Sequence, residues 1–135
     1  MAVEVVEEKI EKKAKHSVYV YGTLRPGDGE PHVIPGQIFD LGWFPGLKML
    51  SPDKGEFVVA ERVEVSDDQL TSLDSYEGYY PSDPRNSLYI RVPYLDGWTY
   101  IYNKPLASET HKLIPGGDWL TYRNELHGSN ANAIR

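Results

Sequence analysis

The feature that most constrains the fold is a series of short strand-like segments separated by turn residues. The run Ser-Val-Tyr-Val-Tyr at 17–21 is apolar and aromatic throughout, which is typical of a strand covered on both faces. Pro93 predicts that one later strand lies at an edge of the sheet or ends there. Further strands are predicted at 34–41, 47–50, 55–65, 88–94 and 98–103.

Helices are few beside these strands. Ser66 and Gln69 have the spacing of a capping box, and Gly78 is a natural residue to follow a helix end, so a helix is predicted over 67–77. A weaker helix is predicted to start near Gly117 and Asp118. About six short strands with so little helix favour an α+β fold, a small mixed β-barrel flanked by one or two helices.

The length of 135 residues predicts one domain. Residues 1–16 are rich in Glu and Lys and are expected to form a charged tail or short helix, ahead of a domain over 17–126. Residues 127–135 are small and polar and are expected to be a flexible tail. No apolar run approaches the ~20 residues of a membrane span, so a cytoplasmic location is expected. The absence of cysteine excludes disulfides and thiolate chemistry.

The net charge and the spacing of the histidines limit the kinds of ligand that the chain is expected to bind. The net charge of -6 provides no basic face for nucleic acid or an anionic membrane, so a small molecule is the expected partner. The histidines lack metal-ligand spacing, and we expect neither a metal nor a cofactor. The oligomeric state stays open. The four histidines are His16, His32, His111 and His127.

Glu77 is an acidic residue at an unusual position in the predicted helix. Seven positions after Leu70, at about 100° per residue, it returns to within ~20° of Leu70, so a carboxylate continues the apolar stripe. It also lies in the last turn, where the helix dipole opposes a negative charge. Desolvation and the dipole should both raise its pKa, as suits a general acid/base. The alternative is that the helix frays and Glu77 turns to solvent.

A second candidate is the turn Tyr21-Gly22-Thr23-Leu24, at the end of the buried strand. Successive backbone N–H groups after a glycine can form an anion-binding nest, here for a small carboxylate, although a plain turn is the alternative. Tyr89 is either a pocket hydroxyl or a packing residue. Arg91 is expected to form an ion pair facing solvent.

Three motifs resemble the γ-glutamylcyclotransferase-like superfamily, in its γ-glutamylamine cyclotransferase and plant avirulence-induced-gene-like branch. The opening Val18-Tyr19-Val20-Tyr21-Gly22-Thr23-Leu24-Arg25-Pro26-Gly27 is similar to the family's first strand and loop. The segment Leu73-Asp74-Ser75-Tyr76-Glu77-Gly78-Tyr79 resembles its catalytic segment, and Ser87-Leu88-Tyr89-Ile90-Arg91 resembles its Tyr-x-Arg strand. The likeness covers about 17–124.

The resemblance implies a small mixed β-barrel enzyme that releases 5-oxoproline and a free amine from a γ-glutamyl amide. It implies that Glu77 is the essential carboxyl and that Gly22, Thr23 and Leu24 hold the γ-glutamyl end. Tyr21 and Tyr89 match aromatic positions that line the same pocket.

Two other interpretations stay open. In one, the protein is a non-catalytic module that binds a γ-glutamyl compound or another small carboxylate in the same pocket. A fold does not guarantee an activity, but a carboxylate binder gains nothing from the charge of Glu77. In the other, the leaving group is unusual, such as an isopeptide lysine or a secondary metabolite. The segment 79–86, with acidic Asp83, is then the rim that selects the amine.

Overall fold

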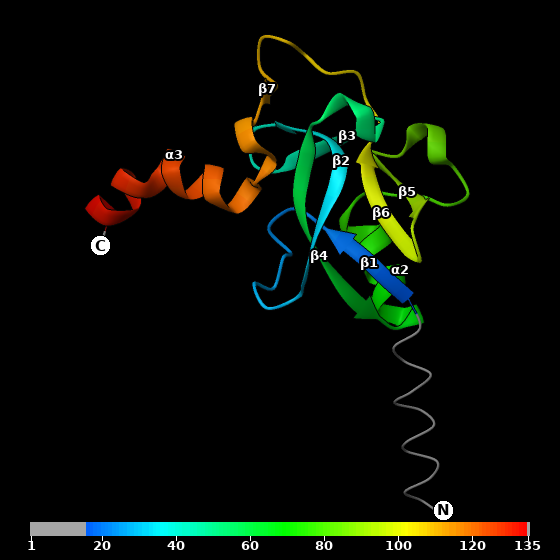
Figure 1. The fold of residues 1–135 in the computed structure, drawn as a ribbon. Helices are drawn as coiled ribbons and strands as arrows, with labels where there is room; N and C mark the ends of the chain where they lie inside the picture. The colour runs from blue at the N-terminus through cyan, green and yellow to red at the C-terminus, as the bar shows by residue number, and fades with distance from the viewer. Residues whose placement is uncertain (1–15, 135) are drawn as a thin grey trace, which may run out of the picture. The chain divides into compact units, whose positions relative to one another are not determined.

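The computed structural model describes residues 16–134, with side chains for 16–126, so the predicted charged tail lies outside the described residues except for His16. The chain forms two compact units, whose elements are drawn in Figure 1. Of the described residues, the first unit contains 16–19 together with Arg62–Lys104. The second unit contains Val20–Glu61 and residues 105–134. No helix in the described part of the chain is long and apolar enough to cross a membrane.

The strands of the first unit are β1 (His16–Val20), β5 (Tyr89–Tyr94), β6 (Gly97–Tyr102) and the second half of β4 (Phe57–Val65), in the order β4-β1-β6-β5. Strand β1 runs parallel to β6, and its apolar residues are buried, as a two-sided strand requires. A Cβ at Gly97 would lie 2.0 Å from the carbonyl oxygen of Ser17, so only glycine fits at the start of β6.

Helix α2 (Asp67–Tyr76) follows β4, and the 3-10 helix η2 (Pro84–Asn86) precedes β5. The predicted capping box is confirmed, because Ser66 Oγ accepts the N–H of Gln69 while the Gln69 side chain accepts the N–H of Ser66. Leu70 and Asp74, one turn apart, are the buried residues of the helix. The Tyr100 hydroxyl donates to Asp74 at 2.6 Å, so this buried stripe faces β6.

The second unit is built around β2 (Glu30–Asp40), which pairs antiparallel with β3 (Pro45–Met49) and β7 (Lys112–Leu113). The first half of β4 also belongs to this unit, as do η1 (Pro52–Lys54), η3 (Pro115–Gly117) and α3 (Trp119–Ile134). Its core is aliphatic, because alternate side chains of the strands point to one face. The fully enclosed side chains are Ile34, Ile38, Leu47 and Val58.

All six predicted strands are present, with ends shifted by a few residues. Pro93 lies in β5, at the edge of the strand order, as predicted. Strand β7 was not predicted, since two residues carry no readable alternation. The α+β composition of strands with two α-helices agrees with the predicted class.

Helix α3 begins at Trp119, beside the predicted start near Gly117 and Asp118. It continues to Ile134. The flexibility expected of residues 127–135 stays a prediction.

Candidate active site

The end of α2 fixes the place of Glu77. Glu77 is the C-cap, with φ -82° and ψ -2°, and Gly78 follows in the left-handed conformation with φ +67°. The N–H of Tyr79 donates to the Asp74 carbonyl and the N–H of Gly78 donates to the Ser75 carbonyl, which is the Schellman pattern. The helix therefore keeps Glu77 in a helical conformation, one residue beyond its last residue Tyr76. The alternative, in which the helix frays and Glu77 turns to solvent, does not occur.

The carboxyl group of Glu77 is half-buried in the first unit. Burial raises its pKa from 4.5 to about 7, since desolvation disfavours the charged form. Among the described residues of this unit, no cation forms an ion pair with Glu77 that would lower its pKa toward the usual 4.5. The carboxyl can therefore both accept and release a proton near neutral pH.

Two buried tyrosines, Tyr89 and Tyr100, lie close enough to this carboxyl for its charge to act on their hydroxyls. Burial raises the pKa of Tyr89, and the nearby charge of Glu77 raises it further. The ring of Tyr89 meets that of Tyr102 edge to face at a centroid distance of 5.6 Å. The structure therefore brings together two of the predicted site residues, Glu77 and Tyr89, and Tyr89 is both packed and close to the carboxyl.

A charged network is centred on Asp74, three residues before Glu77 on the same helix, and it is not among the predictions from the sequence. Arg91 Nε donates to Asp74 Oδ1 at 2.9 Å, and a second guanidinium nitrogen donates to Oδ2 at 3.2 Å. The guanidinium also lies 4.3 Å from the ring centroid of Trp98. The expected ion pair of Arg91 exists, but it is largely buried and does not face solvent, with side-chain exposures of 17% and 10% for Arg91 and Asp74. The position of Asp74 four residues after Leu70, on the buried stripe, was the available signal.

The segment 79–86 after Glu77 is held by polar contacts. Ser87 is fully buried, and its Oγ accepts the N–H of Tyr80 at 2.8 Å and donates to the Asp83 carbonyl at 3.1 Å. Asn103, just beyond β6, donates to the carbonyls of Pro84 and Ser87. The carboxylate of Asp83 accepts a hydrogen bond from Asn86. These contacts give the proposed rim a defined backbone path.

The turn Tyr21-Gly22-Thr23-Leu24 lies in the second unit. Tyr21 is buried, and the N–H of Arg25 donates to the carbonyl of Gly22 at 3.1 Å, closing the turn. Thr23 and Leu24 are exposed. Among the residues that the structure describes, no group accepts the backbone N–H of Thr23 or Leu24. Two adjacent free N–H groups are what the predicted anion-binding nest needs.

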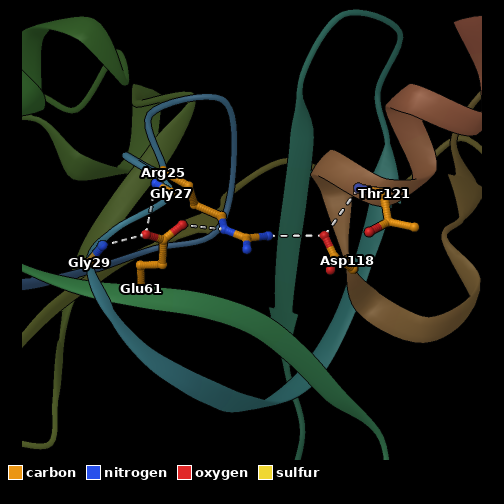
Figure 2. A network of polar contacts seen from close by, with 6 residues as sticks. All are labelled: Arg25, Gly27, Gly29, Glu61, Asp118 and Thr121. Carbon is orange, nitrogen blue, oxygen red and sulfur yellow. Dashed lines mark hydrogen bonds and ion pairs between the residues drawn. The ribbon is translucent and has the colours of Figure 1, made fainter. Parts of the chain in front are cut away.

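Figure 2 shows the network next to this turn, in which Glu61 of β4 meets the chain at three points. Glu61 Oε1 accepts the N–H groups of Gly27 and Gly29 at 2.9 and 2.8 Å, and Oε2 accepts Arg25 Nε at 2.9 Å. Burial alone would raise the pKa of Glu61, but these hydrogen bonds lower it overall. The two glycine N–H groups lie beyond the predicted nest at residues 21–24, and the protein's own carboxylate binds them.

Asp118 completes the network. Its Oδ1 accepts a hydrogen bond from the Arg25 guanidinium at 3.0 Å and another from the backbone N–H of Thr121, in the first turn of α3. The sequence pattern points to neither Glu61 nor Asp118 as part of a site. Within residues 16–126, whose side chains the structure describes, no three His, Cys, Asp or Glu side chains gather as they would around a metal ion.

Residues 18–121 match the family model described as gamma-glutamyl cyclotransferase, AIG2-like. The chain is similar to the gamma-L-glutamyl-butirosin B gamma-glutamyl cyclotransferase of Niallia circulans, with 32% identity over 130 residues, 79% of this chain and 77% of the relative. An uncharacterised protein of Pyrococcus horikoshii has the same fold, with a TM-score of 0.58 and 20% identity over 84% of this chain and 98% of its own.

The structural likeness confirms the predicted fold class, an α+β fold with a small mixed sheet of about six strands and two helices. The family match spans both units and includes every residue that the sequence analysis placed in a site. The chain therefore belongs to the AIG2-like γ-glutamyl cyclotransferase family.

Proposed function

We propose that the protein is a γ-glutamylcyclotransferase that releases 5-oxoproline and a free amine from a γ-glutamyl amide, with Glu77 as the general acid/base. The observation that carries the proposal is the half-buried carboxyl of Glu77, whose pKa of about 7 suits proton transfer in both directions. Family membership supports cyclotransferase chemistry in general.

A γ-glutamyl amide contains its own nucleophile. Its α-amine attacks the γ-carbonyl carbon, forms the C–N bond of a five-membered ring and gives a tetrahedral intermediate. The bond to the leaving nitrogen then breaks, and the products are 5-oxoproline and the amine. Holding the chain folded for this attack supplies a proximity effect worth several kcal/mol.

The protons need a carrier, because the α-amine is mostly an ammonium at neutral pH and an amide nitrogen leaves poorly unless it is protonated. The Glu77 carboxylate takes one proton of the α-ammonium and later gives a proton to the leaving nitrogen, so its charge is the same at the start and end of the cycle. The attacking nitrogen loses a second proton as the ring closes, and this proton leaves with the amine as its ammonium form or passes to solvent. A carboxyl with an ordinary pKa would accept the first proton too weakly.

The other roles follow from the motif resemblance. Tyr21, Gly22, Thr23 and Leu24 hold the glutamyl end, and the free N–H groups of Thr23 and Leu24 suit its α-carboxylate. The resemblance also assigns Tyr89 to the substrate pocket, and the charge of Glu77 acts on its hydroxyl. The name of one relative refers to γ-L-glutamyl-butirosin B, which supports the proposal that this chain acts on γ-glutamyl amides beyond simple dipeptides.

The test is release of 5-oxoproline from a panel of γ-glutamyl amines, γ-glutamyl amino acids, γ-glutamyl-lysine isopeptide and glutathione. We expect turnover of at least one member and a loss of about 10²- to 10⁴-fold in Glu77→Gln. Glu64→Gln is the matched control, since Glu64 is an exposed glutamate of β4. Unchanged turnover in Glu77→Gln would end the proposal, and a folded but silent wild type would favour the non-catalytic binding module.

A further inference from the structure

The charged cluster of Arg25, Glu61 and Asp118 is more enclosed than surface ion pairs are. The side chains of Glu61 and Arg25 are 6% and 12% exposed, and Asp118 is 30% exposed. Taking charges out of water is costly unless the geometry is good and the remaining donors and acceptors are satisfied. Here both oxygens of Glu61 are used, and the guanidinium bridges two carboxylates (Figure 2).

The backbone that this cluster holds belongs to no helix or strand. Residues 21–29 lie between β1 and β2 and lack ladder hydrogen bonds. Gly27 has φ +92°, and a Cβ at Gly29 would lie 2.9 Å from Glu61 Oε1, so both glycines let the chain wrap closely around the carboxylate. Glu61 therefore provides the hydrogen bonds that secondary structure provides elsewhere.

Arg25 connects the cluster to the turn that precedes it. Its backbone N–H closes the turn on Gly22, while its side chain is held by Glu61 and Asp118. Thr23 and Leu24, which carry the free N–H groups, lie between Gly22 and Arg25 in the chain. Because Arg25 is fixed at both its backbone and its side chain, the backbone dihedral angles of Thr23 and Leu24 are restricted.

We propose that Arg25, Glu61 and Asp118 are positioning residues that hold the Gly22–Leu24 turn in the conformation that binds the glutamyl end of the substrate. This inference rests on the proposed function, because that function assigns the turn to the glutamyl end. The cluster touches no part of the substrate itself. Since every γ-glutamyl amide shares that end, the cluster governs affinity for all substrates equally and does not govern the choice of amine.

Three substitutions separate the parts of the cluster. Glu61→Gln keeps the shape but places an amide N–H₂ against either the Arg25 donor or the two glycine N–H groups. Arg25→Lys keeps the charge, but an ammonium on a single stem does not reproduce the fork that spans two carboxylates. Asp118→Asn keeps an acceptor for Thr121 and loses only the charge. The expected order of effect is Glu61→Gln, then Arg25→Lys, then Asp118→Asn.

The experiment measures kcat and KM for two γ-glutamyl amides with different amines, in the wild type and the three variants, with Glu64→Gln as the control. Amide hydrogen exchange of residues 22–29 is followed by NMR in the same samples. We expect faster exchange at Gly27 and Gly29 in Glu61→Gln, with KM raised roughly ten-fold for both substrates and kcat within about three-fold of the wild type. If Glu61→Gln does not fold, Asp118→Asn provides the same comparison with a smaller shift.

Three outcomes overturn the inference. These are unchanged exchange at the loop amides, faster exchange with unchanged KM, and a KM increase that differs strongly between the two amines. If the wild type releases no 5-oxoproline from any substrate, the proposed function fails separately. The positioning role of the cluster is then tested by titration with 5-oxo-L-proline, in which the NMR signals of the amides of residues 22–29 are followed. Weaker binding in Glu61→Gln supports it, and equal binding or none by the wild type overturns it.

Discussion

Arg91 donates to both carboxylate oxygens of Asp74, and Asp74 lies three residues before Glu77 on the same helix. The hydroxyl of Tyr100 donates to Asp74 Oδ1 at 2.6 Å, so one buried carboxylate connects α2 to both β5 and β6. A carboxylate that accepts three hydrogen bonds from two strands fixes the rotation of its helix. The rotation of α2 in turn places Glu77 beside Tyr89.

Removing Arg91 is therefore expected to lower the stability of the fold strongly. Arg91→Met leaves Asp74 buried without its cation, and we expect the free energy of unfolding to fall by about 3–5 kcal/mol. Urea denaturation measures it. Arg123→Met, at an exposed arginine of α3, is the control and should stay within about 0.5 kcal/mol. The double variant Arg91→Met/Asp74→Asn should be less destabilised than the two single effects added together, and simple additivity would argue against a coupled pair.

The raised pKa of Glu77 also predicts how stability depends on pH. Between the ordinary value of 4.5 and the folded value of about 7, the folded chain binds more protons than the unfolded chain, so the free energy of unfolding falls as pH rises. The contribution is fully present below about pH 4.5 and is lost as the pH passes 7. It corresponds to about 3 kcal/mol at most.

Glu77→Gln removes this dependence. Relative to the wild type, the variant should gain stability as the pH rises from 4 to 8, and at pH 8 it should be the more stable protein by up to about 3 kcal/mol. Urea denaturation at several pH values gives the difference curve, from which all other titrating groups cancel. A curve that Glu64→Gln reproduces to the same extent would show that the effect does not come from the buried site.

The same group predicts a pH–rate profile for the proposed reaction. The carboxylate form of Glu77 is the one that accepts the proton of the α-ammonium, so kcat/KM should fall as the pH drops below about 7. Initial rates of 5-oxoproline release between pH 5 and 9 measure this. The residual rate of Glu77→Gln should lack the inflection. An inflection near 4.5 in the wild type would mean that the catalytic carboxyl is an exposed one.

The parts that the sequence predicts correctly are those fixed by local patterns. The place of Glu77 follows from the helical period and from a capping box that links Ser66 with Gln69, three residues away. Strand alternation and turn residues are equally local. The family follows from three short motifs in order.

The parts that the sequence misses join distant residues. Arg91 and Asp74 are 17 positions apart, Arg25 and Glu61 are 36 apart, and Arg25 and Asp118 are 93 apart. A charge pattern in one segment does not identify its partner in another, and burial of Glu61 is decided by the loop that folds over it. The two-residue strand β7 is missed for the same reason, because pairing with β2 defines it.

Gly78 ends α2 directly after Glu77. An alanine there would have to adopt φ +67°, which costs about 1 kcal/mol, and its Cβ would lie 3.3 Å from the Cβ of Leu88. Gly55 is a matched control, because it has φ +72° after η1 and nothing within 4 Å of its Cβ position. We expect both Gly→Ala variants to be destabilised in urea, with Gly78→Ala the more so.

The variants Gly78→Ala and Gly55→Ala should differ most in kcat. Crowding against Leu88 shifts the end of α2, and a shift of the C-cap moves the Glu77 carboxyl out of the geometry that proton transfer requires, so kcat should fall in Gly78→Ala. Gly55→Ala has the same backbone strain at a helix end that carries no catalytic group, and its kcat should be close to that of the wild type. Equal losses of kcat in both variants would mean that general destabilisation, not the position of Glu77, limits turnover.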